Sequence, residues 1–327
     1  MTTLDDQWAV TLFSFTRELM RGDVSATQLL VNLRESNVAR SFEIDGFQHF
    51  ATLPDVASWE AAAFRQAVDE HDIELTQFGV YDDLFIDPRS AADMRSRVEY
   101  IVRQIDSASR LGFTTVKITW GLELAILERL LPHLDRLGMR LNQEAQGPIR
   151  ATSPDLARRV ELALRFPDQF GFVFDLSACM YGLPVTYLED LRRLGVAEEA
   201  VRLLEEGWPL GGDSIRSEAF AAAGPMSPDA KLRLSMPFSR FGNSNVREFR
   251  DFLALVDVVH LKFWDLEDEA GIITSPIRDL ARELQRAGFA GPITSEWGGH
   301  EWLPAAETNG ETMTLAHREV FRSAIRE

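Results

Sequence analysis

The stretch FGFVFDLS, at residues 170–177, has two distinct faces when it is read as a β-strand. Phe172 and Phe174 point to one side, and the residues between them, ending with Asp175, point to the other. We expect the phenylalanines to face a layer of helices and the alternate residues to line the interior of a closed sheet. Asp175 lies at the carboxyl end of the strand, so its side chain should open onto the mouth of such a barrel.

Short β-rich runs alternate with longer amphipathic segments along the whole chain. We predict strands at Trp8–Ser14, Ser41–Asp45, Leu75–Tyr81, Thr115–Thr119, Met139–Glu144, Gly171–Leu176, Val256–Lys262 and Pro292–Trp297. We predict helices at Ser25–Glu35, Ser58–His71, Ala91–Leu111, Gly121–Leu137, Ser153–Phe166, Thr186–Glu206 and Ile277–Ala287. Eight strands alternating with helices predict an α/β fold, a (β/α)8 TIM barrel. A doubly wound open sheet is the second possibility, although no glycine-rich phosphate turn follows the first strand.

The spacing between predicted strands six and seven is longer than the others. Asp175 and His260 are 85 positions apart, whereas one βα unit takes about 30 to 36 positions elsewhere in the chain. We therefore predict one TIM-barrel domain over residues 1–327, with an insertion at approximately residues 177–250. The insertion contains Trp208, Phe238 and Phe241, which a plain linker would lack, so we expect a folded cap or a partner-binding region; a mobile lid is the alternative.

The composition excludes several classes of protein. The chain has 327 residues and a formal net charge of −17, and such a field repels nucleic acids and anionic membranes. Its single cysteine, Cys179, cannot form an internal disulfide. The acidic start of the chain does not resemble a signal peptide, and no apolar run is long enough to span a bilayer. We expect a soluble cytoplasmic protein.

Four metal-ligating residue types fall at or near the ends of predicted strands five to eight. These are Glu144, Asp175, His260 and Glu296. Oxygen donors with one imidazole suit Mn²⁺ best, with Co²⁺, Mg²⁺ or Zn²⁺ also possible. Three carboxylates close together would repel one another unless a cation neutralised them. The alternative is that each acid is solvated or paired with an arginine, but four on consecutive strands favour a metal site.

The order, parity and spacing of these four residues resemble those of the xylose-isomerase-like barrels, the sugar isomerase/epimerase superfamily. The resemblance extends from VTLFSF in strand one to TSEWGG in strand eight. Members of this superfamily hold one divalent ion with Glu, Asp, His or Gln, and Glu on strands five to eight. The resemblance therefore implies metal binding by the four residues named above.

Within the superfamily, several segments resemble the large (α) subunit of C-glycoside deglycosidases. They are VTLFSFTREL, LGFTTVKI, YLEDLRRLGVAEEAVRLLEEGW, HLKFWDLEDEAG and SEWGGHEW. The resemblance implies a lyase that cleaves the C–C bond of a 3-oxo-C-glycoside by enolisation and elimination, together with a small β subunit in a hetero-oligomer. A ketose isomerase or epimerase is the alternative. The chain departs from the pattern near the strand-five Glu, where relatives carry a His and this chain has Ala145 and Gln146.

Further residues are candidates for catalysis and substrate binding. His49, His300 and Lys117 are predicted to be catalytic, the first two as a general base and the lysine as an electrostatic stabiliser. Lys117 could instead be paired with Glu43. The predicted substrate-binding residues are Lys262, Trp120, Trp264 and Trp297. His71, His133 and His317 are expected to be solvated on the outer helical layer.

Three rival functions remain for this fold. An endonuclease of the abasic-site type needs a basic face and a His-rich zinc cluster, which the charge and the histidine positions do not favour. A non-catalytic sugar-binding barrel would have no use for a four-ligand metal set. A structural subunit of a larger complex is compatible with the aromatic insertion.

Overall fold

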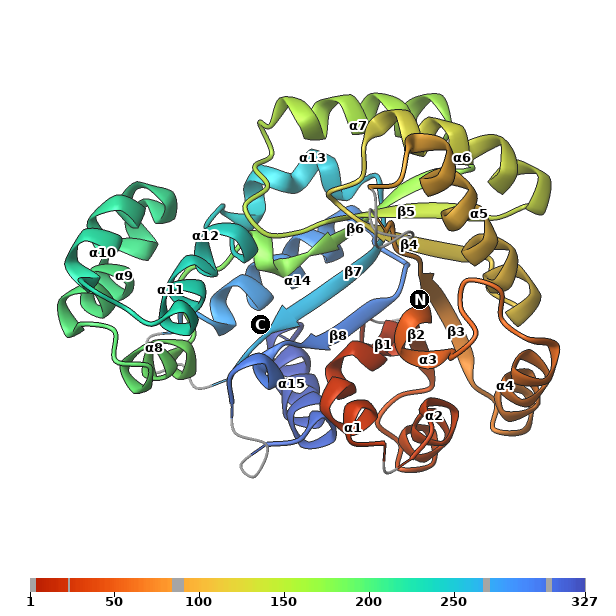
Figure 1. The fold of residues 1–327 in the computed structure, drawn as a ribbon, viewed down its shortest axis with the longest axis horizontal. Coiled ribbons are helices and arrows are strands. Elements are labelled where there is room, and N and C mark those ends of the chain that lie inside the picture. The colour runs from red at the N-terminus through yellow and green to blue at the C-terminus, as the bar shows by residue number, and fades with distance from the viewer. Residues whose placement is uncertain (1–3, 23, 84–90, 267–270, 304–307, 327) are drawn as a thin grey trace.

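The computed structural model describes residues 4–22, 24–83, 91–266, 271–303 and 308–326, and it closes into a barrel (Figure 1). Residues 267–270, which belong to the motif HLKFWDLEDEAG, lie outside this range. Eight parallel strands pair in sequence order, and β8 pairs with β1. They are β1 (Trp8–Thr11), β2 (Ser41–Asp45), β3 (Glu74–Gly79), β4 (Thr115–Thr119), β5 (Arg140–Ala145), β6 (Phe170–Asp175), β7 (Val256–Phe263) and β8 (Ile293–Trp297). The predicted (β/α)8 fold is confirmed.

Helices surround the sheet and connect its strands. In the barrel they are α1 (Thr16–Arg21), α2 (Ala26–Glu35), α3 (Gly46–His49), α4 (Ser58–Glu70), α5 (Met94–Leu111), α6 (Leu124–Leu137), α7 (Pro154–Arg165), α13 (Arg250–Leu253), α14 (Thr274–Ala287) and α15 (Gly310–Ala324). Short 3₁₀ turns occupy Leu4–Gln7, Leu12–Phe15, Leu176–Ala178, Gly212–Ile215, Val246–Phe249 and Gly299–Glu301. No helix among the described residues is long and apolar enough to cross a membrane.

The predicted parity of β6 agrees with the packing. The ring of Phe172 lies 4.8 Å from that of Phe252, and Phe174 lies 5.1 Å from Phe249, so both point into the helical layer. Asp175 lies on the interior face and is fully buried. Burial of such rings is worth about 1.5–3 kcal/mol each, which is how an alternating pattern fixes the register of a strand.

Several predicted elements have different bounds in the structure, and two of them have a clear physical reason. The first strand stops at Thr11, whose hydroxyl accepts a hydrogen bond from the backbone of Phe13 and starts a 3₁₀ turn. The predicted helix Thr186–Glu206 is two helices, because Gly195 adopts a left-handed φ of 79° and ends the first of them. The apolar spacing continues across the break, so periodicity alone did not reveal it.

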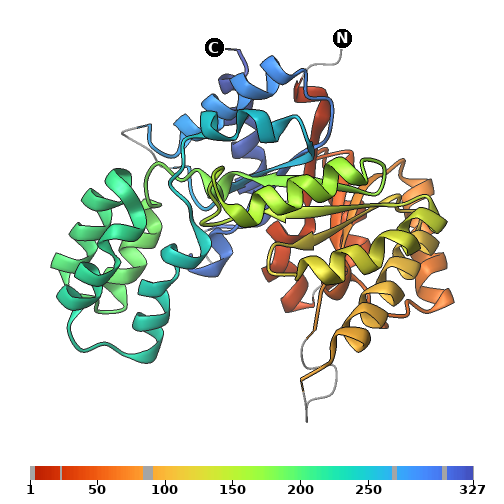
Figure 2. The ribbon, with the colours of Figure 1, turned by 90° about the horizontal axis from the view of Figure 1, so that it is seen from above.

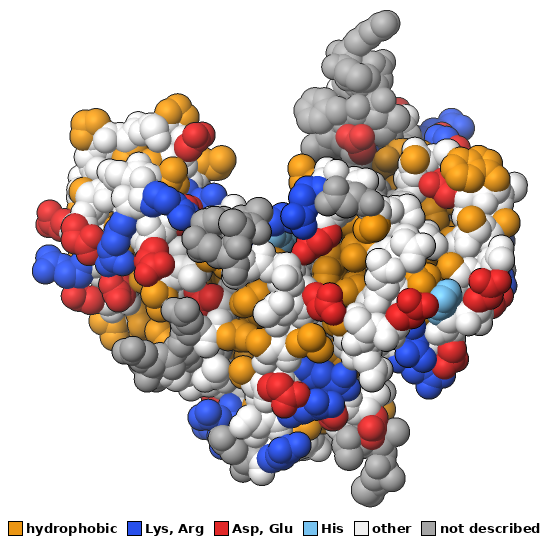
Figure 3. All heavy atoms as spheres, turned by 90° about the horizontal axis from the view of Figure 1, so that it is seen from below, with side chains coloured by type: hydrophobic (Ala, Val, Ile, Leu, Met, Phe, Trp, Pro, Cys, Tyr) orange, Lys and Arg blue, Asp and Glu red, His pale blue; other side chains and the backbone are white. Residues whose placement is uncertain are grey.

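Five of the helices described between β6 and β7 form a separate lobe beside the barrel (Figures 1 and 2). They are α8 (Val185–Arg193), α9 (Glu198–Gly211), α10 (Arg216–Ala223), α11 (Pro228–Ser235) and α12 (Pro237–Arg240). The lobe has its own apolar core, in which Trp208 and Phe241 pack with Trp264 and Trp302 from the loops after β7 and β8. The molecular outline is notched between the lobe and the barrel, and charges of both signs are interspersed over this face (Figure 3).

His317 was expected to be solvated, and this prediction is wrong. The imidazole is fully buried in α15, stacks on Phe263 with ring centroids 3.8 Å apart, and shares a 2.9 Å hydrogen bond with Ser295. Burial lowers the pKa of His317 to about 3. The helical pattern places one face of α15 against the barrel, and His317 lies on that face.

The buried imidazole predicts acid-sensitive stability. The unfolded chain protonates His317 near pH 6.5, whereas the folded chain does so only near pH 3. Between these values the unfolded state binds more protons, so the free energy of unfolding falls as the pH is lowered from 6.5. Urea unfolding should show that the free energy of unfolding falls more between pH 7.5 and pH 5 for the wild type than for His317→Gln. The surface variant His71→Gln is the control, and equal losses in wild type and His317→Gln would contradict the prediction.

Candidate metal and sugar-binding site

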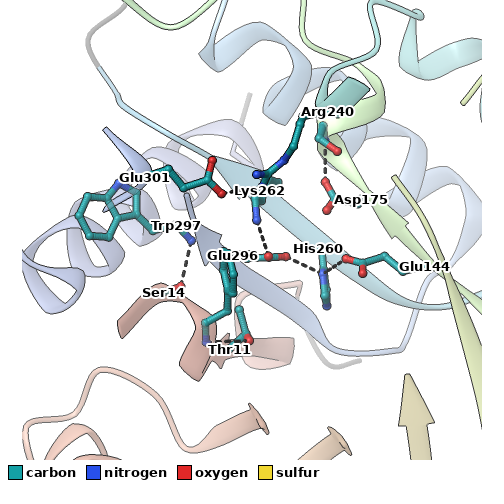
Figure 4. A network of polar contacts seen from close by, with 12 residues as sticks. Thr11, Ser14, Glu144, Asp175, Arg240, His260, Lys262, Glu296, Trp297 and Glu301 are labelled. Atoms are coloured by element: carbon teal, nitrogen blue, oxygen red, sulfur yellow. Dashed lines mark hydrogen bonds and ion pairs between the residues drawn. The ribbon is translucent and has the colours of Figure 1, made fainter. Parts of the chain in front are cut away.

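The four residues predicted as metal ligands meet at the carboxyl ends of β5 to β8 (Figure 4). One ligand atom from each of Glu144, Asp175, His260 and Glu296 lies within 4.8 Å of the other three. All four side chains are buried. The register places Asp175 directly beside His260, and Glu296 beside Lys262, on neighbouring strands.

The buried polar atoms of this cluster suit a shared cation. His260 Nδ1 lies 2.8 Å from Glu144 Oε1 and 2.7 Å from Glu296 Oε2, yet these contacts lack hydrogen-bond geometry. Asp175 Oδ2 likewise has no hydrogen-bond partner within the described part of the chain. Buried polar atoms are rarely left unsatisfied, so their convergence indicates a group that could hold a metal ion.

A second layer of residues orients the imidazole. His260 Nε2 lies 2.7 Å from Glu43 Oε2, and Glu43 Oε1 lies 2.7 Å from Lys117 Nζ. Ligating histidines commonly donate their other N–H to a carboxylate, which leaves the opposite ring nitrogen free as a ligand. Burial alone would raise the pKa of Glu43, but His260 and Lys117 outweigh it and lower that pKa to about 2. The pairing of Lys117 with Glu43 thus exists, and it lies inside the site.

The charges at this end of the barrel do not balance. Five buried carboxylates, Glu43, Asp45, Glu144, Asp175 and Glu296, surround the buried ammonium groups of Lys117 and Lys262. Burial, followed by repulsion from Glu296 and Glu144, raises the pKa of Asp175 to about 7. A divalent cation would supply the positive charge that this donor set needs. The residues therefore fit a divalent ion.

A cavity of about 960 Å³ opens directly above the cluster. Glu144, Glu296, Lys117 and Lys262 form part of its lining, and Trp120 forms part of its wall. Lys262 Nζ contacts Glu296 and lies 4.2 Å from the centroid of the Phe13 ring. Arg159 lies 4.5 Å over the face of Trp120 and holds the indole in place.

The lining also contains residues that were not predicted from the sequence, among them three charged or hydroxyl-bearing side chains that reach the cavity. Asp45 ends β2, Tyr81 follows β3, and Arg240 comes from α12 of the lobe. Asp45 and Tyr81 each end a predicted strand, so the reasoning applied to strands five to eight would have found them. Arg240 forms a 2.5 Å ion pair with Glu301, and no local motif marks this residue.

The structure corrects the expected position of His49. Its side chain lies in a groove between α2 and α4, where Nε2 is 3.1 Å from the hydroxyl of Thr27. Its ring packs against Phe50 and Phe64, and burial lowers the pKa of His49 to about 3. The turn of α3 directs the side chain outward, away from the mouth.

His300 also lies outside the described lining of the cavity. Its ring packs 4.9 Å from Phe13 and 5.7 Å from Trp297. Burial, with the nearby Lys262 and Arg17, lowers the pKa of His300 to about 4. The aromatic ring of Phe13 lines the cavity at this side in its place.

Two of the predicted substrate-binding tryptophans also lie outside the described lining of the cavity. Trp264 and Trp297 are almost fully buried, and the described lining includes neither of them. Trp297 donates a 2.9 Å hydrogen bond to the backbone of Trp264, and Trp264 stacks on Trp302 in the lobe core. Trp297 follows the inward-facing Glu296 in β8 and therefore points away from the interior, and Trp264 lies in the loop after β7. Both support the walls of the site.

Several proteins of known name are similar to this chain over most of its length. One C-glycoside deglycosidase alpha subunit of Arthrobacter globiformis is 26% identical to this chain, and the match covers 97% of this chain and 92% of that relative. Another alpha subunit of the same organism is 29% identical, and the match covers 90% of this chain and 84% of that relative. A 3'-dehydrocarminate deglycosidase alpha subunit of a Microbacterium species is 26% identical, and the match covers 90% of this chain and 88% of that relative. No family model matches the chain.

Solved structures share the fold. A sugar phosphate isomerase/epimerase from Parabacteroides distasonis superposes with a TM-score of 0.53 at 9% identity, covering 97% of this chain and 94% of that one. A xylose isomerase domain protein from Salmonella typhimurium gives 0.52 at 11% identity and covers all of both chains. The resemblance read from the sequence is confirmed: this chain has the TIM-barrel fold of these structures, and it is similar over most of its length to C-glycoside deglycosidase alpha subunits.

Proposed function

We propose that this protein is the metal-dependent α subunit of a C-glycoside deglycosidase, a carbon–carbon lyase acting on 3-oxo-C-glycosides. The observation that carries the proposal is the convergence of Glu144, Asp175, His260 and Glu296 beneath a sugar-sized cavity, in a chain similar to such α subunits. We propose Mn²⁺ as the ion, because carboxylate ligands suit Mn²⁺ and three of the four ligands are carboxylates.

The residues of the site have distinct roles in this reaction. A divalent ion, when bound, supplies Lewis-acid polarisation of a carbonyl oxygen, which acidifies the adjacent C–H. Lys117 and Lys262 present ammonium groups to the same cavity and would stabilise negative charge developing on the substrate oxygen. Burial opposes the charge on Lys117, but Glu144, Glu43 and Asp45 keep its pKa well above the ordinary value. Trp120 offers an aromatic wall to the sugar or the aglycone.

The reaction conserves atoms and charge. A base removes the proton from the carbon adjacent to the 3-oxo group, and an enolate forms. When the carbonyl re-forms, a C=C bond forms within the sugar and the bond to the aglycone carbon breaks. The aglycone leaves with the electron pair and takes up a proton, so the products are an unsaturated 3-oxo sugar and the free aglycone.

The second candidate function is a ketose isomerase or epimerase, in which the enolate is reprotonated instead. A solved structure with the same fold is named a sugar phosphate isomerase/epimerase, and this supports the second candidate. We also propose that a small β subunit joins this chain, since the relatives are named alpha subunits. The lobe of α8 to α12 is the proposed cap or partner-binding region.

Incubation with 3-oxo-C-glucosides and with free ketoses distinguishes these functions. Aglycone release that requires a co-expressed small subunit is the expected result. Interconversion of ketoses by the chain alone would favour the epimerase. Binding of sugars with neither reaction, and without a metal requirement, would contradict both.

A further inference from the structure

Neither of the predicted histidines is placed to be the base that removes the substrate proton. His49 lies in a different groove, and His300 is outside the described lining of the cavity. Lys117 is held as an ammonium by its carboxylate neighbours, so it cannot accept a proton. Directly after Glu144 this chain has Ala145 and Gln146, and neither side chain can act as a base.

Asp45 is the only carboxylate in the described cavity lining that does not belong to the metal-ligand set. Tyr81 donates a 2.7 Å hydrogen bond to Asp45 Oδ1, and Lys117 Nζ lies 3.7 Å from the same oxygen. Both of these contacts use Oδ1 and orient the carboxylate, whose side chain forms part of the cavity lining. A side chain at Gly79 would collide with this carboxylate, so glycine on β3 makes the position possible.

The location of Asp45 suits proton removal beside the metal site. Lys117 Nζ lies 3.7 Å from Asp45 and 3.8 Å from Glu144 Oε2, so one ammonium group separates this carboxylate from a ligand. A sugar whose carbonyl oxygen points to the ligand cluster would therefore place its neighbouring carbon near Asp45. Burial raises the pKa of Asp45 above its usual range, which makes a carboxylate a stronger base.

We infer that Asp45 is the general base of the proposed reaction and that Tyr81 is its positioning residue. This inference rests on the proposed function. Asp45 takes the proton from the carbon adjacent to the carbonyl and, as the carboxylic acid, returns a proton to the aglycone carbon after the C–C bond breaks. Tyr81 fixes the carboxylate through its hydroxyl, and burial raises the pKa of Tyr81 well above 10, so the phenol remains a hydrogen-bond donor.

The test compares Asp45→Asn with wild type, each with its small subunit, on a 3-oxo-C-glucoside. We expect turnover to fall about 100-fold or more, because general base catalysis contributes about 10²–10⁴-fold, with metal content and KM nearly unchanged. Asp45→Glu should regain part of the activity. Added formate should partly restore Asp45→Gly, a readout that a structural role would not move.

Two controls keep the test decisive. Tyr81→Phe should lower turnover about tenfold without loss of metal, and it decides the matter if the Asp45 variants do not fold. Asp55→Asn, an exposed acid paired with Arg103, should behave as wild type. Turnover of Asp45→Asn or of Tyr81→Phe within twofold of wild type would overturn the inference. An inactive wild type would instead contradict the proposed function.

Discussion

Glu144→Ala and Glu296→Gln should each abolish metal retention and turnover together. Each change removes a carboxylate from a four-ligand cluster in which all ligand atoms lie within 4.8 Å. Lewis-acid stabilisation is worth several kcal/mol and each 1.36 kcal/mol is tenfold in rate, so we expect turnover to fall by about 1,000-fold. Elemental analysis of the purified variants, followed by turnover assays with added Mn²⁺, measures both effects.

The exposed Glu128→Gln is the matched control, since Glu128 pairs with Arg165 on the outer layer, and it should keep metal and activity. Wild-type protein should also gain stability on addition of the ion, by about 2.7 kcal/mol at a hundred times the dissociation constant. Full activity in metal-stripped wild type would refute the metal requirement.

Glu43→Gln should weaken metal binding and destabilise the fold, although Glu43 is not one of the four ligands. Its carboxylate contacts both His260 and Lys117 at 2.7 Å inside the barrel. Loss of a carboxylate that orients a ligating histidine typically costs about 10–100-fold in metal affinity or activity. Removal of one partner from a buried ion pair costs about 3–5 kcal/mol. Metal titration and urea unfolding measure these two effects separately.

Glu74→Gln provides the comparison for Glu43→Gln, because Glu74 lies exposed at the opposite end of the barrel, where β3 begins, and hydrogen-bonds Ser41. It should leave metal affinity unchanged. Equal metal affinity in Glu43→Gln and wild type would show that the carboxylate does not orient His260.

The sequence predicted the closed barrel and the four-residue cluster because both depend on strand periodicity. A residue such as Asp175 alternates with buried phenylalanines, and strand ends in a parallel barrel meet at one mouth. His49 was misplaced because it follows a strand end, where the turn sets the direction of its side chain. Trp297 follows the inward-facing Glu296 in β8, so strand alternation directs it away from the interior. Arg240 could not be predicted, since the lobe reaches the mouth only through long-range packing.

The aromatic core between the lobe and the barrel joins two parts of the site that lie on different elements, the candidate ligands and the rim of the cavity. The ligand set resides on strands, whereas α12 contributes Arg240 to the cavity rim and Trp208 packs the segment against the loops after β7 and β8. On the proposed function, exchange of the lobe helices between Val185 and Arg240 should therefore change which aglycones enter the cavity and leave in place the strands that carry the four candidate ligands. The proposed reaction centre and its entrance are thus carried by different elements, which makes the entrance a target for protein engineering.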